Sequence, residues 1–120
     1  MYYLKAVLLE NCYYSNNARQ LLQKYNFKKE IIDVSQSEKN KWKNNEITTF
    51  PQIFLKKENH KDNLFIGGFT DIQFIENQIK SATDKNFSEI KKNIQNKYSH
   101  LSEKSVLRLM ELFIKNSKRN

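Results

Sequence analysis

Cysteine, proline and glycine are scarce in this sequence, which holds one Cys, one Pro and two Gly among 120 residues. A single cysteine cannot form an internal disulfide, so the sequence excludes a disulfide-stabilised scaffold and indicates a reducing compartment, which we expect to be the cytoplasm. No run of about 18 apolar residues is present, which argues against a membrane span. The N-terminal segment MYYLKAVLLE has the pattern of a buried strand and not that of a signal peptide.

Acidic residues are outnumbered by basic ones, 13 against 21, and the formal net charge is +8. The lysines are scattered along the chain, which favours a solvated surface. Nucleic-acid binding needs basic and aromatic residues gathered on one face, so we predict no nucleic-acid partner. The hydrophobic fraction of 38% and the aromatic fraction of 12% are typical of a folded domain with one modest core.

Hydrophobic periodicity predicts an α/β fold in residues 1–82. The expected order of elements is β-α-β-α-β-β-α, which indicates a four-stranded mixed sheet flanked by helices on both faces. Ser15 or Asn16 is expected to cap the first helix, Ser35 the second and Thr70 the third, with Trp42 as the main apolar anchor of the second. In chain order, the predicted strands and helices cover residues 2–9, 15–25, 27–34, 35–45, 52–56, 64–66 and 70–80.

Residues 83–120 form a C-terminal extension with two amphipathic helical stripes. The first stripe runs from Phe87 to Tyr98, and the second from Val106 to Ile114. We expect both helices to pack on the sheet domain. Binding of a partner and dimerisation through the stripes are the alternatives.

Cys12 lies at the predicted junction between the first strand and the first helix. There a thiol is either a small buried side chain or a nucleophile whose thiolate the free N–H groups and the helix dipole stabilise. Ser15 follows in a C-x-x-S spacing, from which its hydroxyl can donate toward the sulfur. Glu10 would disfavour the thiolate if its carboxylate lay close, and the strand pattern leaves its direction open.

The remaining special residues gather in two short motifs. Pro51 stands at the start of a predicted strand, where a ladder N–H is best spared, and a cis bond before it is not expected from the residues alone. Gly67 and Gly68 permit positive φ and a close approach of a ligand to the backbone. Asp71 falls in the first turn of the next helix, where a carboxylate is stabilised and can receive a cationic amine.

Three motifs together resemble the glutaredoxin family, over about residues 2–80. CYYSNNARQLL is similar to the family's C-P-Y-C/S-x-x-A-x-x-L-L, TFPQIF to T-V-P-Q-I-F, and IGGFTDI to I-G-G-x-x-D-L. The resemblance implies the thioredoxin fold and glutathione as co-substrate. It makes Cys12 the nucleophile, supported by Ser15, Gly67 and Gly68, and Phe50–Pro51 a cis bond. The glutathione-binding residues that it implies are Tyr14, Thr49, Phe50, Pro51, Thr70 and Asp71.

The sequence also departs from the family pattern. Ser15 replaces the second cysteine, so only a monothiol route is open. Tyr13 stands where many members have Pro. Leu9 replaces a Lys that would bind the glycyl carboxylate of glutathione, a role for which Lys39 or Lys41 is a candidate.

The leading hypothesis is therefore a glutathione-dependent thiol-disulfide oxidoreductase that removes glutathione from proteins through Cys12. Its partners would be glutathione and glutathionylated proteins or low-molecular-weight disulfides. One alternative is a carrier of a glutathione-ligated 2Fe-2S cluster, bridged by Cys12 of two protomers. The other is a non-catalytic glutaredoxin-like binding module. We predict no metal site built from side chains, and a monomer unless the cluster or the extension produces a dimer.

Overall fold

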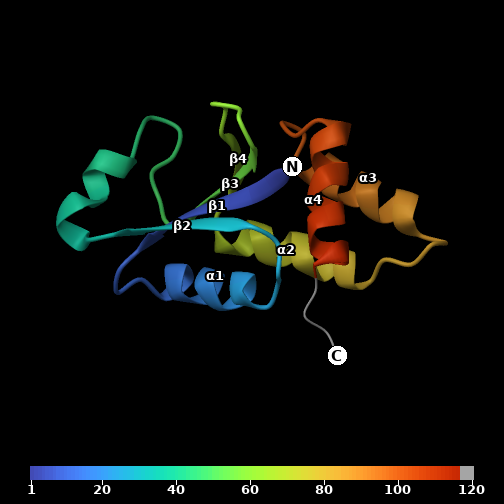
Figure 1. Ribbon diagram of the computed structural model, residues 1–120, viewed down its shortest axis with the longest axis horizontal. Coiled ribbons are helices and arrows are strands. Elements are labelled where there is room, and N and C mark those ends of the chain that lie inside the picture. Colours follow the sequence, from blue (N-terminus) through green and yellow to red (C-terminus); the bar gives the residue numbers. More distant parts are fainter. Residues whose placement is uncertain (117–120) are drawn as a thin grey trace.

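The computed structural model describes residues 1–116, which form a four-stranded mixed sheet with helices around it (Figure 1). The strand order is β2-β1-β3-β4. β1 pairs with β2 in parallel and with β3 antiparallel, and β3 and β4 form an antiparallel hairpin. The predicted thioredoxin-like α/β architecture is confirmed. The strands are β1 (Tyr2–Leu9), β2 (Lys29–Val34), β3 (Gln52–Lys57) and β4 (Leu64–Gly67).

Four α-helices and one 3₁₀ helix accompany the sheet in the described part of the chain. α1 and α2 lie side by side beneath the sheet in Figure 1, and α3 and α4 stand at the end where β1 begins. None of these helices is long and apolar enough to cross a membrane. The helices are α1 (Tyr13–Gln23), η1 (Gln36–Trp42), α2 (Phe69–Lys80), α3 (Phe87–Lys97) and α4 (Glu103–Lys115).

Two helices begin earlier than predicted. α1 has Cys12 as its N-cap, because this residue is extended and its carbonyl accepts the Asn16 N–H at 2.9 Å; Ser15 and Asn16 are therefore inside the helix. α2 has Gly68 as its N-cap, so Thr70 is not the cap. The Asp71 carboxylate reaches back to the Gly68 N–H at 2.8 Å and takes over that role.

The predicted helix over 35–45 is instead the short η1, and the strand predicted from Phe27 begins at Lys29. η1 has no buried residue, and the Ser35 side chain makes no capping hydrogen bond. Trp42 is only half-buried. A segment with a single apolar side chain has no stripe to bury, so packing cannot support a longer helix.

One hydrophobic core lies between the sheet and the α-helices. It contains Leu4, Ala6 and Leu8 of β1 together with buried residues of α1, α2, α3 and α4. The opposite face has buried Val7, Val34 and Gln52 near η1, where Gln52 Nε2 donates to the Trp42 carbonyl at 2.8 Å. The helices thus flank the sheet unevenly, with η1 as the only helix among the described residues on the second face.

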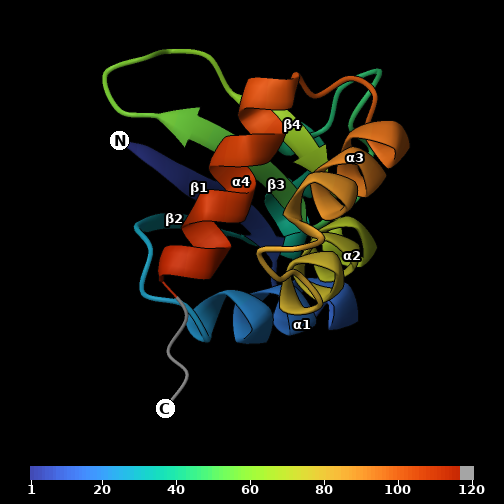
Figure 2. The ribbon, with the colours of Figure 1, turned by 90° about the vertical axis from the view of Figure 1, so that its right-hand side faces the viewer.

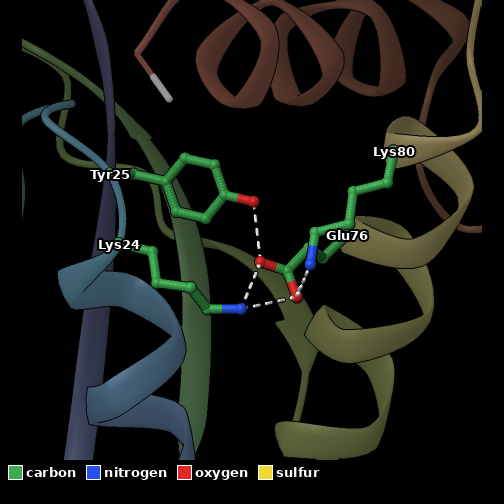
Figure 3. A network of polar contacts seen from close by, with 4 residues as sticks. All are labelled: Lys24, Tyr25, Glu76 and Lys80. Atoms are coloured by element: carbon green, nitrogen blue, oxygen red, sulfur yellow. Dashed lines mark hydrogen bonds and ion pairs between the residues drawn. The ribbon is translucent and has the colours of Figure 1, made fainter. Parts of the chain in front are cut away.

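A buried carboxylate connects α1 and α2 (Figure 3). Glu76 is 3% exposed and accepts a hydrogen bond from the Tyr25 hydroxyl at 2.6 Å. Its oxygens also lie 3.1 Å from Lys24 Nζ and 3.6 Å from Lys80 Nζ. A buried charge needs such partners, so this network fixes the two helices relative to each other.

The C-terminal extension packs on the sheet domain and shares its core (Figure 2). Phe113 of α4 is 2% exposed, and its ring centroid lies 4.7 Å from that of Tyr25 and 5.4 Å from that of Phe27. The Asn26 N–H donates to the Asn116 carbonyl at 2.7 Å. Between α3 and α4, His100 Nε2 lies 3.0 Å from the Phe65 carbonyl oxygen of β4.

Candidate functional site

Three turns meet at one edge of the sheet. In the strand register Val7 is opposite Gln52, and Ile53 is opposite Gly67. The end of β1, the start of β3 and the end of β4 therefore lie at the same edge. Each of the three sequence motifs begins or ends there, with Cys12 after β1, Pro51 before β3 and Gly68 after β4.

Cys12 occupies the N-cap of α1 with a free thiol. Its backbone is extended (φ −118°, ψ 121°), its side chain makes no capping hydrogen bond, and it is partly exposed. The first turn of α1 contains no acidic residue. The first N–H groups of a helix have no intrahelical acceptors, and together with the helix dipole they favour a negative charge at this position. The geometry therefore suits a reactive thiol better than an inert core cysteine.

Glu10 has its own partners away from α1. Its Oε1 accepts the Gln36 N–H at 2.9 Å, and Gln36 Nε2 donates to the Glu10 carbonyl at 2.8 Å. Both bonds tie the turn after β1 to the start of η1. No hydrogen bond joins Glu10 to Cys12 in residues 1–116. The direction of this side chain, which the strand pattern left open, is thus toward Gln36.

Ser15 positions the turn that carries Cys12. Its side chain is 1% exposed, and its hydroxyl accepts the Leu9 N–H at 3.0 Å. This bond joins the start of α1 to the end of β1. The described structure has no hydrogen bond between Ser15 and the sulfur, so the predicted donation to Cys12 is not seen. The serine in the C-x-x-S spacing acts here as a structural link.

Exposed aromatic rings stand next to Cys12. Tyr13 is 73% exposed and Tyr14 53% exposed. The Tyr14 ring centroid lies 5.3 Å from that of Tyr13 and 6.4 Å from that of Phe69, the first residue of α2. Sequence reasoning named Tyr14 and missed Phe69, although its place directly after Gly67 and Gly68 was the available signal. Together the rings form an apolar surface beside the thiol.

The Phe50–Pro51 peptide bond is cis, as the family resemblance implies. Pro51 is buried, Phe50 is half-buried and Thr49 is exposed. A Cβ built on Gly68 would lie 3.5 Å from the Pro51 carbonyl oxygen, so the two motifs are direct neighbours. This contact brings the Gly-Gly turn against the proline turn at the edge of the sheet.

The Asp71 carboxylate occupies the space that a side chain at position 67 would fill. Gly67 has φ +152°, and a Cβ there would collide with the Asp71 carboxylate, so only glycine allows this carboxylate to fold back over the turn. Asp71 Oδ2 accepts the Gly68 N–H, while Thr70 is exposed in the first turn of α2.

The extension reaches the same carboxylate. The Tyr98 hydroxyl at the end of α3 donates to Asp71 Oδ1 at 2.9 Å. Burial of the phenol, and then its hydrogen bond to the charged Asp71, raise the pKa of Tyr98 well above its usual value. The sequence pattern identified Tyr98 only as one member of an apolar stripe, and nothing in that pattern indicates its hydroxyl partner.

Lys39 and Lys41, the two candidates for binding the glycyl carboxylate of glutathione, differ in their contacts. Lys41 Nζ lies 3.2 Å from Glu38 Oε2, whereas Lys39 is partly buried and has no ion pair among the described residues. Within residues 1–116 there is no group of three or more His, Cys, Asp or Glu side chains that could hold a metal ion. Cys12 is the one thiol in the chain that a shared cluster could use.

Comparison with known proteins gives one family. The glutaredoxin family model matches residues 1–60, half of the chain. This match contains the Cys12 and Pro51 motifs, and it ends before the Gly-Gly motif and the extension. No curated protein matches the chain. The matched residues, the strand order and the edge that joins the three motifs agree: the chain belongs to the glutaredoxin family of thioredoxin-fold, thiol-disulfide oxidoreductase-like proteins.

Proposed function

We propose that the protein is a glutathione-dependent thiol-disulfide oxidoreductase of the cytoplasm that removes glutathione from proteins through Cys12 alone. The observation that carries this proposal is the placement of a free, partly exposed thiol at the N-cap of α1, at the sheet edge shared by Pro51 and Gly68. A thiol at this position is accessible to a substrate.

Two exchange steps complete the reaction. The Cys12 thiolate attacks the glutathione sulfur of a protein–glutathione disulfide, and the old S–S bond breaks as the new one forms. The protein leaves as a thiolate and takes a proton from water. A second glutathione, as its thiolate, then attacks the glutathione sulfur on Cys12, which yields glutathione disulfide and restores the Cys12 thiolate. In the net reaction one free glutathione is oxidised for each protein thiol that is released, and the glutathione of the substrate ends in the glutathione disulfide.

Glutathione would bind along the edge that the three turns form. The cis bond, with exposed Thr49 and half-buried Phe50 before it, supports pairing of this backbone with the extended tripeptide as in strand addition. The rings of Tyr14 and Phe69 supply an apolar contact beside it. Asp71, with Thr70 beside it, would receive the γ-glutamyl amine, and Lys39 is the candidate for the glycyl carboxylate.

A coupled assay with a glutathionylated peptide tests the proposal. The wild-type chain should reduce the peptide in the presence of glutathione, and Cys12→Ser should be inactive. Circular dichroism must show both proteins folded. Mass spectrometry of the wild-type chain treated with glutathione disulfide should show one glutathione adduct, located on Cys12. A folded wild type that neither turns over nor forms this adduct would refute the proposal.

A non-catalytic binding module is the second candidate, and one contact favours it. Both oxygens of Asp71 already accept hydrogen bonds, from Gly68 N–H and from the Tyr98 hydroxyl, which weakens its attraction for an incoming amine. A folded, inactive wild type that fails to bind glutathione would support this candidate. A brown dimer after anaerobic reconstitution with iron and sulfide would instead support the cluster carrier.

A further inference from the structure

A cleft of about 500 Å³ lies between α4 and the start of β1. Tyr2 begins β1 and is opposite Lys57 at the end of β3, so this cleft is at the far end of the sheet from Cys12. The eight residues of β1 separate the two places by roughly 25 Å. The lining residues that carry charge or stack are Tyr2, Lys57, Lys104, Arg108, Glu111 and Lys115.

Positive charge dominates the lining. Four cationic side chains face one carboxylate, which leaves a net charge of +3, and that carboxylate, Glu111, is paired with Arg108 at 3.2 Å. Lys57, Lys104 and Lys115 make no ion pair with any described residue. Like charges that converge in a partly enclosed space repel one another, and a bound anion would relieve that repulsion.

Two of the cations share one aromatic ring. Lys57 Nζ lies 5.9 Å and Arg108 Cζ 5.6 Å from the centroid of Tyr2. The ring attracts each cation, and all three residues line the same cleft. Lys57 of β3 and Arg108 of α4 are thus brought together over one ring at the start of β1.

Arg108 has donors to spare. Only its Nη1 donates to Glu111, and its Nε is buried without a hydrogen-bond partner in the described residues. A guanidinium offers five N–H donors in a planar fork that matches the oxygens of a phosphate group. The unused donors beside three unpaired lysines indicate an oxyanion rather than a neutral ligand.

From this cleft we propose a second binding site, which takes a small organic phosphate. Lys57, Lys104, Arg108 and Lys115 would hold the phosphate oxygens, and Tyr2 with Leu112 would contact the organic part. The volume is within the range of small-molecule sites. A neighbouring hollow of about 300 Å³ shares Tyr2 and Lys57, but its Asp62 carboxylate disfavours an anion there, so the phosphate belongs on the α4 side. This site does not depend on the reaction at Cys12.

Calorimetric titration of the full chain at about 0.15 M salt tests the site. The probes are inorganic pyrophosphate and ADP. We expect saturable binding of one molecule, and binding at least about tenfold weaker in Lys57→Gln and in Arg108→Gln. Lys57 is exposed, so its variant will fold even if the Arg108 variant does not. ADP binding tighter than pyrophosphate would support an organic phosphate whose organic part contacts Tyr2 and Leu112, and equal affinity of the two probes would overturn that contact.

Lys85→Gln is the matched control, because Lys85 is exposed and does not line the cleft. It should leave the affinity for both probes unchanged. Absence of saturable binding in the wild-type chain would overturn the proposal. Equal weakening in Lys85→Gln and Lys57→Gln would also overturn it, because this would show attraction to the net charge and not to a site.

Discussion

Substitution of Tyr98 by Phe removes the polar link between the extension and Asp71, in which the Tyr98 hydroxyl lies 2.9 Å from Asp71 Oδ1 and 3.5 Å from the Asp71 carbonyl oxygen. The change removes the hydroxyl that donates to Asp71 Oδ1 and keeps the ring, whose centroid lies 6.0 Å from that of Phe74. Asp71 keeps its bond from the Gly68 N–H. The variant therefore measures what the hydroxyl of Tyr98 contributes to the stability of the fold.

The expected loss of unfolding free energy is about 1–2 kcal/mol. A hydrogen bond to a charged group contributes about 1.5–3 kcal/mol, and half-exposed Asp71 can recover part of this by bonding to water. For a chain of this size that loss lowers Tm by about 4–8 °C. Tyr13→Phe is the control, because Tyr13 is 73% exposed, and we expect its Tm to stay within about 2 °C of wild type.

The pH dependence tests the proton of the Tyr98 hydroxyl separately from the packing of its ring. The pKa of Tyr98 is raised in the folded state by burial and by Asp71, above the usual value of about 10 in the unfolded chain. The folded protein thus holds the phenol proton more tightly, and the resulting stabilisation is fully present below pH 10. As the pH rises above about 10 the unfolded chain loses this proton first, so the stabilisation declines.

Urea unfolding of both proteins between pH 7 and pH 11 measures the effect. The wild type should exceed Tyr98→Phe by a constant amount up to about pH 9, and the difference should shrink at higher pH. Equal stability of the two proteins at pH 7 would refute the assigned contribution. A difference that stays constant up to pH 11 would show that the hydroxyl acts through something other than its proton.

Three further substitutions test the packing and the turn, each by urea unfolding. Glu76→Gln should lower the free energy of unfolding by about 1–2 kcal/mol, because it removes a buried charge from its half-exposed lysine partners. An unchanged urea midpoint would contradict this role. Phe113→Ala should lower the free energy of unfolding by about 3–5 kcal/mol. Ile114→Ala, at a side chain that is 49% exposed, should lower it by less than about 1 kcal/mol. Similar losses in the two variants would show that α4 does not pack as described. Gly67→Ala should lower the free energy of unfolding by more than about 2 kcal/mol, because the new Cβ would clash with the Asp71 carboxylate. Gly68→Ala should lower it less, because a Cβ there would make only a van der Waals contact. The reverse order would contradict the turn geometry.

The strands and the strongly periodic helices could be predicted from the sequence, because their apolar residues repeat with the period of the element they form. Leu21 and Leu22 of α1 and Ile72 and Ile75 of α2 are all buried. The starts of α1 and α2 could not be predicted from side-chain capping preferences, whereas α4 does begin after Ser102, whose hydroxyl accepts the Ser105 N–H at 3.1 Å. Cys12 caps α1 without a side-chain bond, and α2 is capped by a carboxylate that folds back onto a glycine.

The motif residues of the candidate site could be identified, and their physical partners could not. Ser15 bonds to Leu9 and Glu10 to Gln36, and both bonds depend on how distant elements come together in three dimensions. Tyr98 is 27 residues from Asp71. Periodicity reports which face of a helix is buried and carries no information about the partner of a hydroxyl on that face.

The contact between His100 and Phe65 bears on self-association. β4 is an edge strand, and an unpaired edge is a template onto which the strand of another chain can add. The Phe65 carbonyl can only accept, so His100 Nε2 carries the proton and occupies that backbone group of the edge. The loop between α3 and α4 therefore occupies one of the backbone groups through which another chain could pair with β4. A fragment cut at residue 60, where the family match ends, would lack β4 and Phe113, which would leave β3 unpaired on one side and the rings of Tyr25 and Phe27 uncovered, and we expect it to precipitate.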